Sequence, residues 1–485
     1  MAEMRFGGQR VTIVGLAREG TALARFLAER GATVTATDQK PARALKAQLD
    51  ALAGLPISYR LGGHPDEIFE ADVVFLSPGV PFDSPVAQGA RQRGIPLSSE
   101  TRLFTRLCPA PIVGITGSSG KTTTTALVGE MLEKSHPGQV WVGGNIGQPL
   151  IGHLDEIRPD DWVVMELSSF QLELFGPWDL GGRGHGPLFD PAGWSPPVAA
   201  ILNVTPNHLD RHRTMEAYTA AKREIIAYQK PGDTAVLGFD NAVTRGLAAD
   251  CPGRAIFFGT AGWKATGLEG WGAILDDDVI AIRSEGEVRP VCRSGELRLR
   301  GRHNVENVLA ACAIASAAGA GAKALRAVAT TFEGLPHRLE LVREFKGVRY
   351  YNDSIATSPE RAIAALNSFD EPIVLLAGGR DKHLPWDDLA RLAHRKARHA
   401  ILFGEAAPII QRAMQAVPGG CQVHLAATME VATELAANLA QPGDMVLLSP
   451  GGTSFDAFQD FEERGERFKE KVKQLGERGQ CLPVN

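Results

Sequence analysis

A glycine-rich turn with a lysine and a row of threonines is the part of the sequence best suited to chemistry. The apolar run PIVGITG (111–117) leads into SSGKTTTT (118–125), so a strand, a flexible turn and a helix are expected in that order. In such an arrangement, main-chain N–H groups and the positive end of the helix face a bound anion. Lys121 would neutralise the β- and γ-phosphates of ATP, and the hydroxyl of Thr122 or Thr123 would ligate Mg²⁺. The turn therefore predicts a phosphate-binding loop.

The spacing of this turn differs from the common phosphate-loop pattern G-x-x-x-x-G-K-[ST]. Ile115 stands where the first glycine of that pattern belongs. The alternative is a glycine-rich turn that Lys and Thr follow by chance. The order of strand, turn and helix favours the phosphate-binding interpretation.

Three further polar residues accompany the next expected elements. Glu166 lies in the predicted strand WVVMELSS (162–169), where a carboxylate would reach a metal ion held by the phosphates. His208 follows the predicted strand AAILNVT (199–205), but Mg²⁺ prefers oxygen ligands, so residue type alone favours a capping or core histidine. Lys222 lies in a helical stretch, where composition alone predicts an exposed lysine.

The start of the chain carries a weaker nucleotide signal. The segment G-L-A-R-E-G (15–20) lacks the middle glycine of the dinucleotide-binding pattern G-x-G-x-x-G. Asp38 ends the second predicted strand about where a ribose-binding acid would lie. NAD, another nucleotide and a plain structural turn all remain open for this segment.

Short β-branched runs alternate with helical stretches along the chain, which is typical of parallel α/β sheets. VTIVG (11–15), ATVTATD (32–38) and DVVFLSPG (72–79) are expected to be strands one to three of a Rossmann-like unit. A second series of strands starts at residue 111, and a third follows GLPHR (334–338). The chain is therefore predicted to form three α/β domains, namely a Rossmann-like domain at 1–109, a central P-loop ATPase-like domain at 110–335 and a Rossmann-like domain at 336–485.

Composition limits the class of protein. The 485 residues are 44% hydrophobic and 22% charged, enough for several buried cores. A net charge of −5 disfavours nucleic-acid binding. The six cysteines lie far apart without a Cys-x-x-Cys pair, which fits a reducing compartment and gives no zinc motif. The N-terminus lacks a signal-peptide core and no run suits a membrane span, so a cytoplasmic protein without membrane insertion is expected.

One segment stands apart from this alternation. Residues 180–197, LGGRGHGPLFDPAGWSPP, hold five glycines and four prolines. This composition predicts an irregular surface loop or insertion, and no function follows from it.

A longer pattern links the residues above. Eight blocks follow one another in the chain: GGNIGQPL (143–150), MELSSFQLE (165–173), NVTPNHLDRH (203–212), YTAAKREI (218–225), GRHNVENVLAA (301–311), GLPHRLE (334–340), NDSIATSPE (352–360) and LSPGGTSFDAFQDFEERGERF (448–468). In this order they resemble the Mur ligase family over nearly the whole chain. The phosphate loop T-G-x-x-G-K-T-T is also similar to the form found in that family, and the E-L-S-S-F-Q-L run is similar to its D-glutamate-adding members.

The resemblance implies an ATP-dependent, ADP-forming ligase of peptidoglycan precursor synthesis. Such an enzyme would activate the carboxylate of UDP-N-acetylmuramoyl-L-alanine as an acyl phosphate, which the amine of D-glutamate then attacks. Two Mg²⁺ ions are implied, and so is a carbamate on Lys222 that helps to hold the second ion. A monomer that binds neither nucleic acid nor membrane is expected.

The resemblance also assigns roles to individual residues. It implies Lys121, Glu166, His208 and Lys222 as catalytic residues, and Thr122, Glu166, His208 and Lys222 as metal ligands. The implied ATP-binding residues are Gly117, Ser118, Ser119, Gly120, Lys121, Thr122, Thr123, Asn304, Arg338 and Asp353. The implied UDP-substrate residues are Glu19, Asp38, Gln39, Lys40, Ser77, Gly79 and Asn145. Thr357, Lys382, Ser454 and Phe461 are implied to bind the amino acid, because a lysine and two hydroxyls suit a dicarboxylate.

Three positions depart from the family pattern. Ile355 replaces the lysine common in N-D-S-K-A-T, which removes one cation near the phosphate and amino-acid sites. Arg380 or Lys382 could compensate for that loss. Ser119 stands where asparagine is usual, and Asn207 where aspartate is usual before the histidine.

Several alternatives share parts of this pattern. An L-glutamate-adding Mur ligase would use the same residues, and the sequence does not give the stereochemistry of the amino acid. A folylpolyglutamate synthase is disfavoured because residues 1–108 form a UDP-binding type of domain. A P-loop nucleotide switch would not need Glu166, His208 and Lys222 together.

Overall fold

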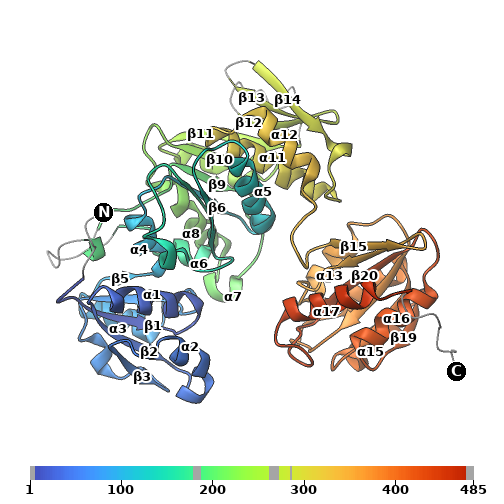
Figure 1. Ribbon diagram of the computed structural model, residues 1–485, viewed down its shortest axis with the longest axis horizontal. Coiled ribbons are helices and arrows are strands. Elements are labelled where there is room, and N and C mark those ends of the chain that lie inside the picture. The colour runs from blue at the N-terminus through green and yellow to red at the C-terminus, as the bar shows by residue number, and fades with distance from the viewer. Residues whose placement is uncertain (1–5, 178–186, 190, 261–271, 285–286, 477–485) are drawn as a thin grey trace. The chain divides into compact units, whose positions relative to one another are not determined.

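The computed structural model describes residues 6–177, 187–189, 191–260, 272–284 and 287–476. The first domain is a five-stranded parallel sheet in the order β3-β2-β1-β4-β5 (Figure 1). Its strands are β1 (Arg10–Val14), β2 (Thr33–Asp38), β3 (Ile57–Leu61), β4 (Val73–Leu76) and β5 (Leu97–Ser98). The accompanying helices are α1 (Arg18–Glu29), α2 (Lys46–Ala51), α3 (Pro85–Gln92) and α4 (Glu100–Leu107).

The strand order of this sheet reverses at β1, which lies between β2 and β4. Ligands of open parallel sheets bind outside the carboxyl ends of the strands at such a switch point. The turn after β1 contains Gly15 at φ 91°, and a Cβ on Gly20 would lie 2.0 Å from the Gly15 carbonyl oxygen. Glycine at both positions lets α1 pack directly on the turn.

Two strands of this sheet, β3 and β5, were missed by sequence reasoning. The segment 72–79, predicted as the third strand, contains β4, because β3 precedes it. Side chains along β3 alternate between half-buried and exposed, and the strand lies at the sheet edge. Its ISYRL sequence therefore lacks the continuous apolar run by which the buried strands were recognised.

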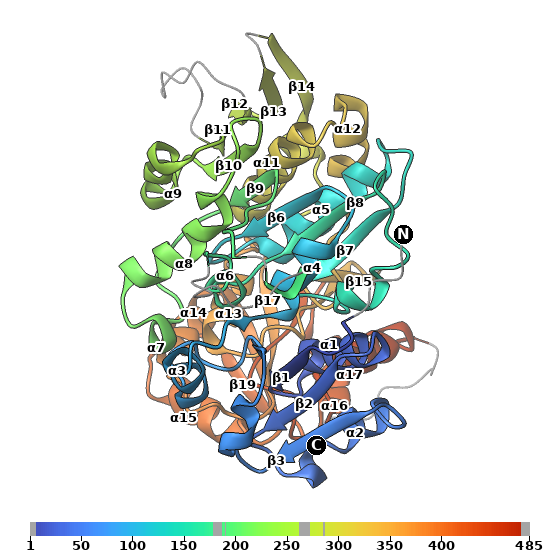
Figure 2. The same cartoon turned by 90° about the vertical axis from the view of Figure 1, so that its left-hand side faces the viewer.

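The central domain contains a nine-stranded sheet in the order β14-β13-β12-β11-β10-β9-β6-β8-β7 (Figure 2). The strands from β6 to β12 form parallel pairs with one another, whereas β13 pairs antiparallel with both β12 and β14. The strands are β6 (Ile112–Thr116), β7 (Val140–Gly144), β8 (Trp162–Glu166), β9 (Val198–Ile201), β10 (Thr234–Gly238), β11 (Arg254–Gly259), β12 (Gly272–Asp276), β13 (Val279–Ser284) and β14 (Glu287–Arg293). The helices used below are α5 (Lys121–Glu133), α6 (Ser169–Leu172), α7 (Leu209–His212), α8 (Met215–Ala227), α11 (Arg302–Ala317) and α12 (Ala322–Thr331).

The third domain has a six-stranded sheet in the order β15-β16-β20-β17-β18-β19, in which only the β15–β16 pair is antiparallel. Its strands are β15 (Glu340–Phe345), β16 (Val348–Asn352), β17 (Ile373–Gly378), β18 (Ala397–Phe403), β19 (Gln422–Leu425) and β20 (Met445–Gly451). Helices α13 (Pro359–Leu366), α14 (Asp387–Lys396), α15 (Ala407–Gln415), α16 (Met429–Leu439) and α17 (Phe461–Lys473) complete it. The central strands β17 and β20 are wholly buried, as expected for strands covered on both faces.

The chain separates into two compact units. One comprises residues 1–296 and 306–330, which include the first and central domains, and the other comprises residues 297–305 and 331–485. The predicted fold class, three α/β domains with parallel-rich sheets, is confirmed, while the exact domain boundaries stay predictions. No helix among the described ranges has the length and hydropathy needed to cross a membrane.

The glycine- and proline-rich segment 180–197 falls partly outside the described residues, at 180–186 and 190. Within its described part, Leu188 and Phe189 are buried, and Ser195 donates a hydrogen bond from Oγ to the Glu224 carbonyl oxygen (3.0 Å). The prediction of a surface loop is therefore wrong for these residues. Their apolar side chains pack into the core despite the irregular backbone.

Candidate active site

The predicted phosphate loop is the turn between β6 and α5. Gly120 ends this turn at φ 82°, a left-handed conformation that favours glycine, and α5 begins at Lys121. The loop is fastened from the segment after β9, because the main-chain N–H of Ser118 donates to the Asn203 carbonyl oxygen (2.9 Å) and that of Ser119 donates to Asn203 Oδ1 (2.9 Å). The strand, turn and helix follow one another as the sequence indicated.

Two lysine side chains meet at the start of this loop. Nζ of Lys121 donates to the Gly117 carbonyl oxygen at 3.0 Å, and Nζ of Lys222 donates to the same oxygen at 2.9 Å. Lys222 also donates to Thr116 Oγ1 (3.2 Å), and its side chain is only 1% exposed. Helix α8 thus directs a buried cationic group at the phosphate loop, contrary to the exposed lysine that composition predicted.

This arrangement is unfavourable for the charged form of Lys222. Burial lowers its pKa to about 6, with a further lowering by the charge of Lys121 and an opposing effect from Glu166. Near neutral pH the Lys222 amine is therefore largely uncharged, and an uncharged amine is a nucleophile.

Glu166 ends β8, the strand beside β6, so its carboxylate lies at the same sheet edge as the phosphate loop. Oε1 accepts a hydrogen bond from Asn145 Nδ2 at 2.9 Å. Oε2 is buried and has no hydrogen-bond partner within the described part of the chain. An unsatisfied carboxylate oxygen beside a phosphate loop is suited to a cation.

His208 lies in the loop after β9, with a left-handed backbone at φ 53°. Its ring contacts Phe170 edge-on, with 5.0 Å between ring centroids, and its side chain makes no helix-capping bond. Partial removal from water lowers its pKa first, and the nearby charges of Lys121 and Lys222 lower it further. The uncharged imidazole that results is the form able to ligate a metal.

The structure thus brings the predicted catalytic set to one edge of the central sheet. Its members come from the loops or strand ends after β6, β8 and β9 and from α8. In the part of the chain that is described, no three His, Cys, Asp or Glu side chains form a ready metal site. The predicted ligands include only Glu166 and His208 of those types, so Thr122 and a modified Lys222 would have to complete the set.

Two partners of this site were missed by sequence reasoning. The Tyr218 hydroxyl lies 3.1 Å from Ser118 Oγ, and Lys222 Nζ lies 4.8 Å from the centre of the Tyr218 ring. A Cβ on Gly120 would lie 2.3 Å from Asn307 Oδ1 on α11. Both residues occur in the blocks YTAAKREI and GRHNVENVLAA, but neither residue type by itself indicates contact with a distant loop.

The residues predicted to bind the UDP substrate follow the carboxyl ends of β1, β2, β4 and β7. The Asp38 carboxylate accepts from the N–H of Leu16 and that of Lys40, both at 2.8 Å, and so fixes the turns after β1 and β2. Ser77 donates from Oγ to the Gly15 carbonyl oxygen at 2.7 Å. Arg18 links this region to the central domain, since Nη2 donates to the Asn145 carbonyl oxygen at 3.1 Å. Gln39, Lys40 and Gly79 lie in the same loops.

Glu19 differs from the other members of this set because it is buried. Its Oε1 accepts from Gln171 Nε2 at 2.9 Å, and burial raises its pKa to about 7. Burial and the charge of Glu19 raise the pKa of Glu100 to about 8. The two carboxyl groups lie between α1, α4 and α6, where Glu19 packs at the boundary of the two domains, and its role toward the UDP substrate stays a prediction.

The second compact unit carries the other predicted nucleotide residues, which are Asn304, Arg338 and Asp353. Asn304 donates from Nδ2 to the Arg300 carbonyl oxygen at 2.7 Å. Asp353 Oδ2 accepts from Ser449 Oγ at 2.8 Å, and burial raises the pKa of this carboxyl group to about 7. His337 and Leu339, on either side of Arg338, have left-handed backbones at φ 63° and 46°. Strained backbone of this kind gathers at functional sites.

The predicted amino-acid residues gather at the carboxyl edge of the third sheet. Thr357 follows β16, Lys382 follows β17, Ser454 follows β20 and Phe461 begins α17, and these three strands are neighbours in the sheet. The loops are joined by main-chain bonds, because the N–H of Gly451 donates to the Ala356 carbonyl oxygen at 2.8 Å.

Arg464 holds the loops after β16 and β20 together through hydrogen bonds, and this role was not predicted from the sequence. It is fully buried, with Nη2 donating to the Ser354 carbonyl oxygen (2.8 Å) and Nη1 donating to that of Gly452 (3.1 Å). Burial lowers its pKa to about 10. The segment FEERGERF (461–468) is rich in charged residues, so the sequence alone predicts an exposed arginine at this position.

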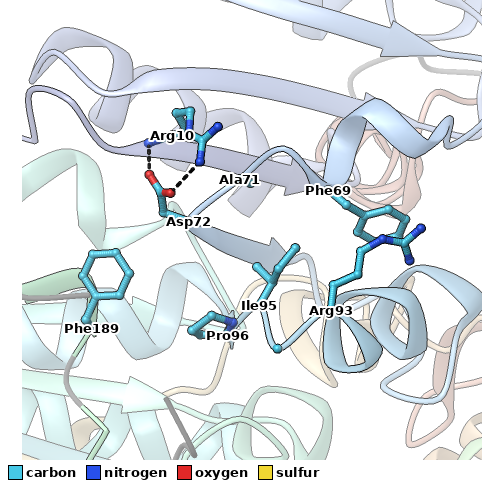
Figure 3. A pocket seen from close by; sticks show the side chains of 9 residues that line it. Arg10, Phe69, Ala71, Asp72, Arg93, Ile95, Pro96 and Phe189 are labelled. Carbon is cyan, nitrogen blue, oxygen red and sulfur yellow. Dashed lines mark hydrogen bonds and ion pairs between the residues drawn. The ribbon is translucent and has the colours of Figure 1, made fainter. Parts of the chain in front are cut away.

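A cavity of about 310 Å³ lies at the opposite, amino-terminal edge of the first sheet. Figure 3 shows Arg10 and Asp72 paired on one side of it, with Nη2 and Oδ1 3.0 Å apart, and Arg93 beside Phe69 on the other. None of the predicted site residues lines it. The cavity is therefore separate from the chemistry described above.

Comparisons with known proteins agree along nearly the whole chain. Three family models match: "Mur ligase MurD-like, N-terminal domain" at residues 9–99, "Mur ligase middle domain" at 115–315 and "Mur ligase, glutamate ligase domain" at 337–452. The chain belongs to the Mur ligase family. The predicted family and its ligase class are thereby confirmed.

Individual relatives of this Mur ligase carry a narrower name. A UDP-N-acetylmuramoylalanine--D-glutamate ligase of Acetivibrio thermocellus is 40% identical over 474 residues, which is 96% of this chain and 97% of the relative. The ligase of the same name from Roseiflexus sp. is 43% identical over 97% of this chain and 99% of the relative.

Solved structures agree with the Mur ligase fold. The MurF ligase of Thermotoga maritima, solved in complex with ADP, matches with a TM-score of 0.56 at 18% identity, and the match covers 98% of this chain and 100% of that one. At this identity the likeness supports the architecture alone. The roles of individual site residues stay predictions.

Proposed function

We propose that this Mur ligase joins D-glutamate to UDP-N-acetylmuramoyl-L-alanine, with ATP converted to ADP and phosphate. The observation that carries the proposal is the meeting of Lys121 and Lys222 on one carbonyl oxygen of the phosphate loop, at the sheet edge where Glu166 has an unpartnered oxygen. Cations and a metal-binding carboxylate are what phosphoryl transfer to a carboxylate needs. The names of the full-length relatives supply the two substrates.

The reaction balances in two steps. A carboxylate oxygen of the alanyl group attacks the γ-phosphorus of ATP, forming a C–O–P bond as ADP leaves. The amine of D-glutamate then attacks the acyl carbon, and phosphate leaves with the oxygen it received from the carboxylate. The amine loses one proton as the amide forms. Both steps gather negative charge at one place, so positioning and charge compensation provide most of the catalysis.

The residues proposed to bind ATP lie in both compact units. Residues 117–123 hold the phosphates through main-chain N–H groups and the Lys121 ammonium group. Asn304, Arg338 and Asp353 contribute from the second unit, where Asp353 is buried and Arg338 lies in a strained turn.

Mg²⁺ suits the donor set of the central domain. Thr122, Glu166, His208 and a modified Lys222 would hold it, and the unpartnered Oε2 of Glu166 is a buried anionic oxygen that a cation would satisfy. Bound there, Mg²⁺ supplies charge compensation between phosphates and carboxylate. Lys222 is only 1% exposed, and it shares the Gly117 carbonyl oxygen with Lys121. This arrangement supports a carbamate on Lys222.

Carbamate formation needs an uncharged amine and carbon dioxide. The nitrogen lone pair attacks the carbon, a C–N bond forms as one C=O π bond breaks, and one proton leaves to solvent, so that the neutral amine becomes an anionic carbamate. A buried amine whose pKa is lowered to about 6 is largely uncharged near neutral pH and can react in this way. The product has two oxygen donors, the type that Mg²⁺ prefers.

The remaining sites follow the carboxyl edges of the other two sheets. The loops with Asp38, Gln39, Lys40, Ser77 and Gly79, together with Asn145, would bind the UDP substrate. Thr357, Lys382, Ser454 and Phe461 would bind the amino acid. We further propose domains at 1–109, 110–335 and 336–485 and a cytoplasmic location, where ATP and nucleotide sugars are available.

The proposal is tested by ADP release with UDP-N-acetylmuramoyl-L-alanine and each common amino acid in both configurations. D-glutamate alone should drive ADP and phosphate release in equal amounts with the ligated product. Equal or better activity with L-glutamate would instead assign the chain to the L-glutamate-adding variant, for which the departure at Ile355 is the specific observation. ATP turnover without any amino acid would favour a nucleotide switch.

A further inference from the structure

Helix α13, which follows β16, carries a cation just after the NDSIATSPE segment. Arg361, in the first turn of α13, is exposed, and its Nη1 donates to the Ile355 carbonyl oxygen at 3.2 Å. The main-chain N–H of Thr357 donates to the same oxygen at 2.8 Å. Arg361 and Thr357 therefore meet at one carbonyl, and the guanidinium group lies beside a residue of the proposed amino-acid site.

Lys382, in the loop after β17, lies within electrostatic reach of this guanidinium. Partial burial lowers the Lys382 pKa first, and the charge of Arg361 lowers it further, with no carboxylate acting in the opposite direction. Within the described ranges, neither Arg361 nor Lys382 forms an ion pair with Asp or Glu. The charge of Arg361 also acts on the buried carboxyl group of Asp353, whose pKa burial raises to about 7, so this carboxyl group compensates Arg361 only in part. Two cations that are held near each other without an ion pair are unfavourable until an anion binds between them.

Arg380, the other cation of this region, is already neutralised. Its Nε and Nη2 donate to the two carboxylate oxygens of Glu405 at 2.8 and 3.0 Å. A bidentate pair of this kind occupies the planar face with which arginine would bind a ligand carboxylate. The sequence suggested that Arg380 or Lys382 could replace the positive charge missing at Ile355. Lys382 is available to bind a ligand carboxylate, whereas Arg380 is already paired with Glu405.

We propose that Arg361, together with Lys382, binds a carboxylate of the incoming amino acid. Arg361 supplies from α13 the positive charge that Ile355 does not provide in the loop before it. This inference rests on the proposed function, because it deepens the amino-acid site of the same reaction. It assigns Arg361 to the acceptor amino acid and not to the transferred phosphoryl group.

The test compares Arg361→Gln and Arg361→Lys with the parent enzyme in full steady-state kinetics. Arg412→Gln is the matched control, because Arg412 is an exposed arginine of the same domain whose Nε donates to one main-chain carbonyl oxygen, that of Pro408 (3.3 Å). The KM for D-glutamate should rise about 10- to 100-fold in Arg361→Gln, as expected for a lost charge-assisted contact. The KM for ATP and for the nucleotide substrate should stay within about threefold of the parent.

Arg361→Lys should recover part of the affinity, since it keeps the charge but loses the planar fork. An unchanged D-glutamate KM in Arg361→Gln would overturn the inference. So would a rise confined to the KM for ATP or a fall confined to kcat, because either would assign Arg361 to the phosphoryl group. If the parent itself releases no ADP with D-glutamate, the proposed function fails. If the parent is active with D-glutamate but Arg361→Gln has the same KM for D-glutamate, the proposed function stands and only the role of Arg361 is refuted.

Discussion

Lys222 is the residue on which the chemistry of the central domain depends most. A lysine ammonium group that is 1% exposed, 2.9 Å from the carbonyl oxygen that Lys121 also contacts, is held in an environment that disfavours its charge. Glu166 is the one neighbouring carboxylate that acts in the opposite direction. Conversion of the amine to a carbamate resolves this conflict, because the resulting anion is attracted to the charge of Lys121.

Lys222→Ala should therefore lose roughly 100- to 1,000-fold in kcat. Acetate or another small carboxylate should restore part of the activity by occupying the space of the missing carbamate, whereas ammonium or methylamine should not. Lys230→Ala, which removes an exposed lysine just after α8, should behave like the parent. Full activity of Lys222→Ala, or an unmodified Lys222 amine in a catalytically active preparation, would contradict the carbamate.

Some of the individual site residues could be predicted from the sequence, and others could not. Residue order alone predicted Lys121 and its loop, since a strand, a glycine turn and Lys-Thr are local features. It could not predict the burial of Lys222, because a lysine in YTAAKREI has the composition of an exposed helix face. Only the resemblance to Mur ligases singled it out. Arg464 and Arg361 stayed unnoticed because their partners, mostly main-chain carbonyl groups, lie in distant or irregular segments.

Helices α1, α4 and α6 join the first domain to the central domain through buried polar side chains. Gln171 Nε2 donates both to Glu19 Oε1 (2.9 Å) and to Thr101 Oγ1 (3.1 Å). Glu100 Oε1 accepts from the Ile151 N–H at 3.3 Å. Two buried carboxyl groups so close together cannot both ionise without cost, and the charge of Arg18 offsets only part of that cost.

This packing predicts a pH-dependent stability. The folded-state pKa values of about 7 for Glu19 and about 8 for Glu100 lie above the ordinary value of 4.5, so the folded chain binds these protons more tightly than the unfolded chain. The stability contributed by the pair is full below pH 4.5 and is lost as pH rises through 7 and 8. Glu100→Gln cannot ionise, so its Tm should fall less than the parent's between about pH 6 and pH 9, by ~2–4 °C.

Glu29→Gln is the control for this prediction, because Glu29 lies on α1 in a half-exposed pair with Arg25. It should leave the pH dependence of Tm unaltered. A Glu100→Gln variant whose Tm falls with pH as steeply as the parent's would show that the two carboxyl groups do not share this environment.

Many strands were predictable because they contain runs of apolar or β-branched residues. The apolar runs at β1, β2, β4, β6, β8, β9, β16, β17, β18 and β20 were recognised from sequence. The edge strand β3 was missed because its half-exposed residues do not form an apolar run, whereas β5 and β10 were missed although their side chains are buried. The Leu188–Phe189 turn was misjudged because the surrounding glycines and prolines mask two core side chains.

Three sheets give this Mur ligase three carboxyl edges, and the predicted residues gather at all of them. The first sheet would present the nucleotide-sugar substrate, the central sheet the phosphate loop and metal ligands, and the third sheet the amino acid. The first two sheets belong to one compact unit and the third to the other. The predicted ATP residues lie in both units. The family resemblance could therefore name them one by one, but no local sequence pattern predicts that they act on the same ligand.

The central claim is that the substrate carboxylate becomes an acyl phosphate. The most direct test uses UDP-N-acetylmuramoyl-L-alanine labelled with oxygen-18 in its alanyl carboxylate, together with ATP, Mg²⁺ and unlabelled D-glutamate. The account predicts that each phosphate released carries one oxygen atom from that carboxylate and that phosphate and the glutamyl product form in equal amounts. Phosphate that contains only oxygen from ATP or water, formed alongside ADP, would contradict it.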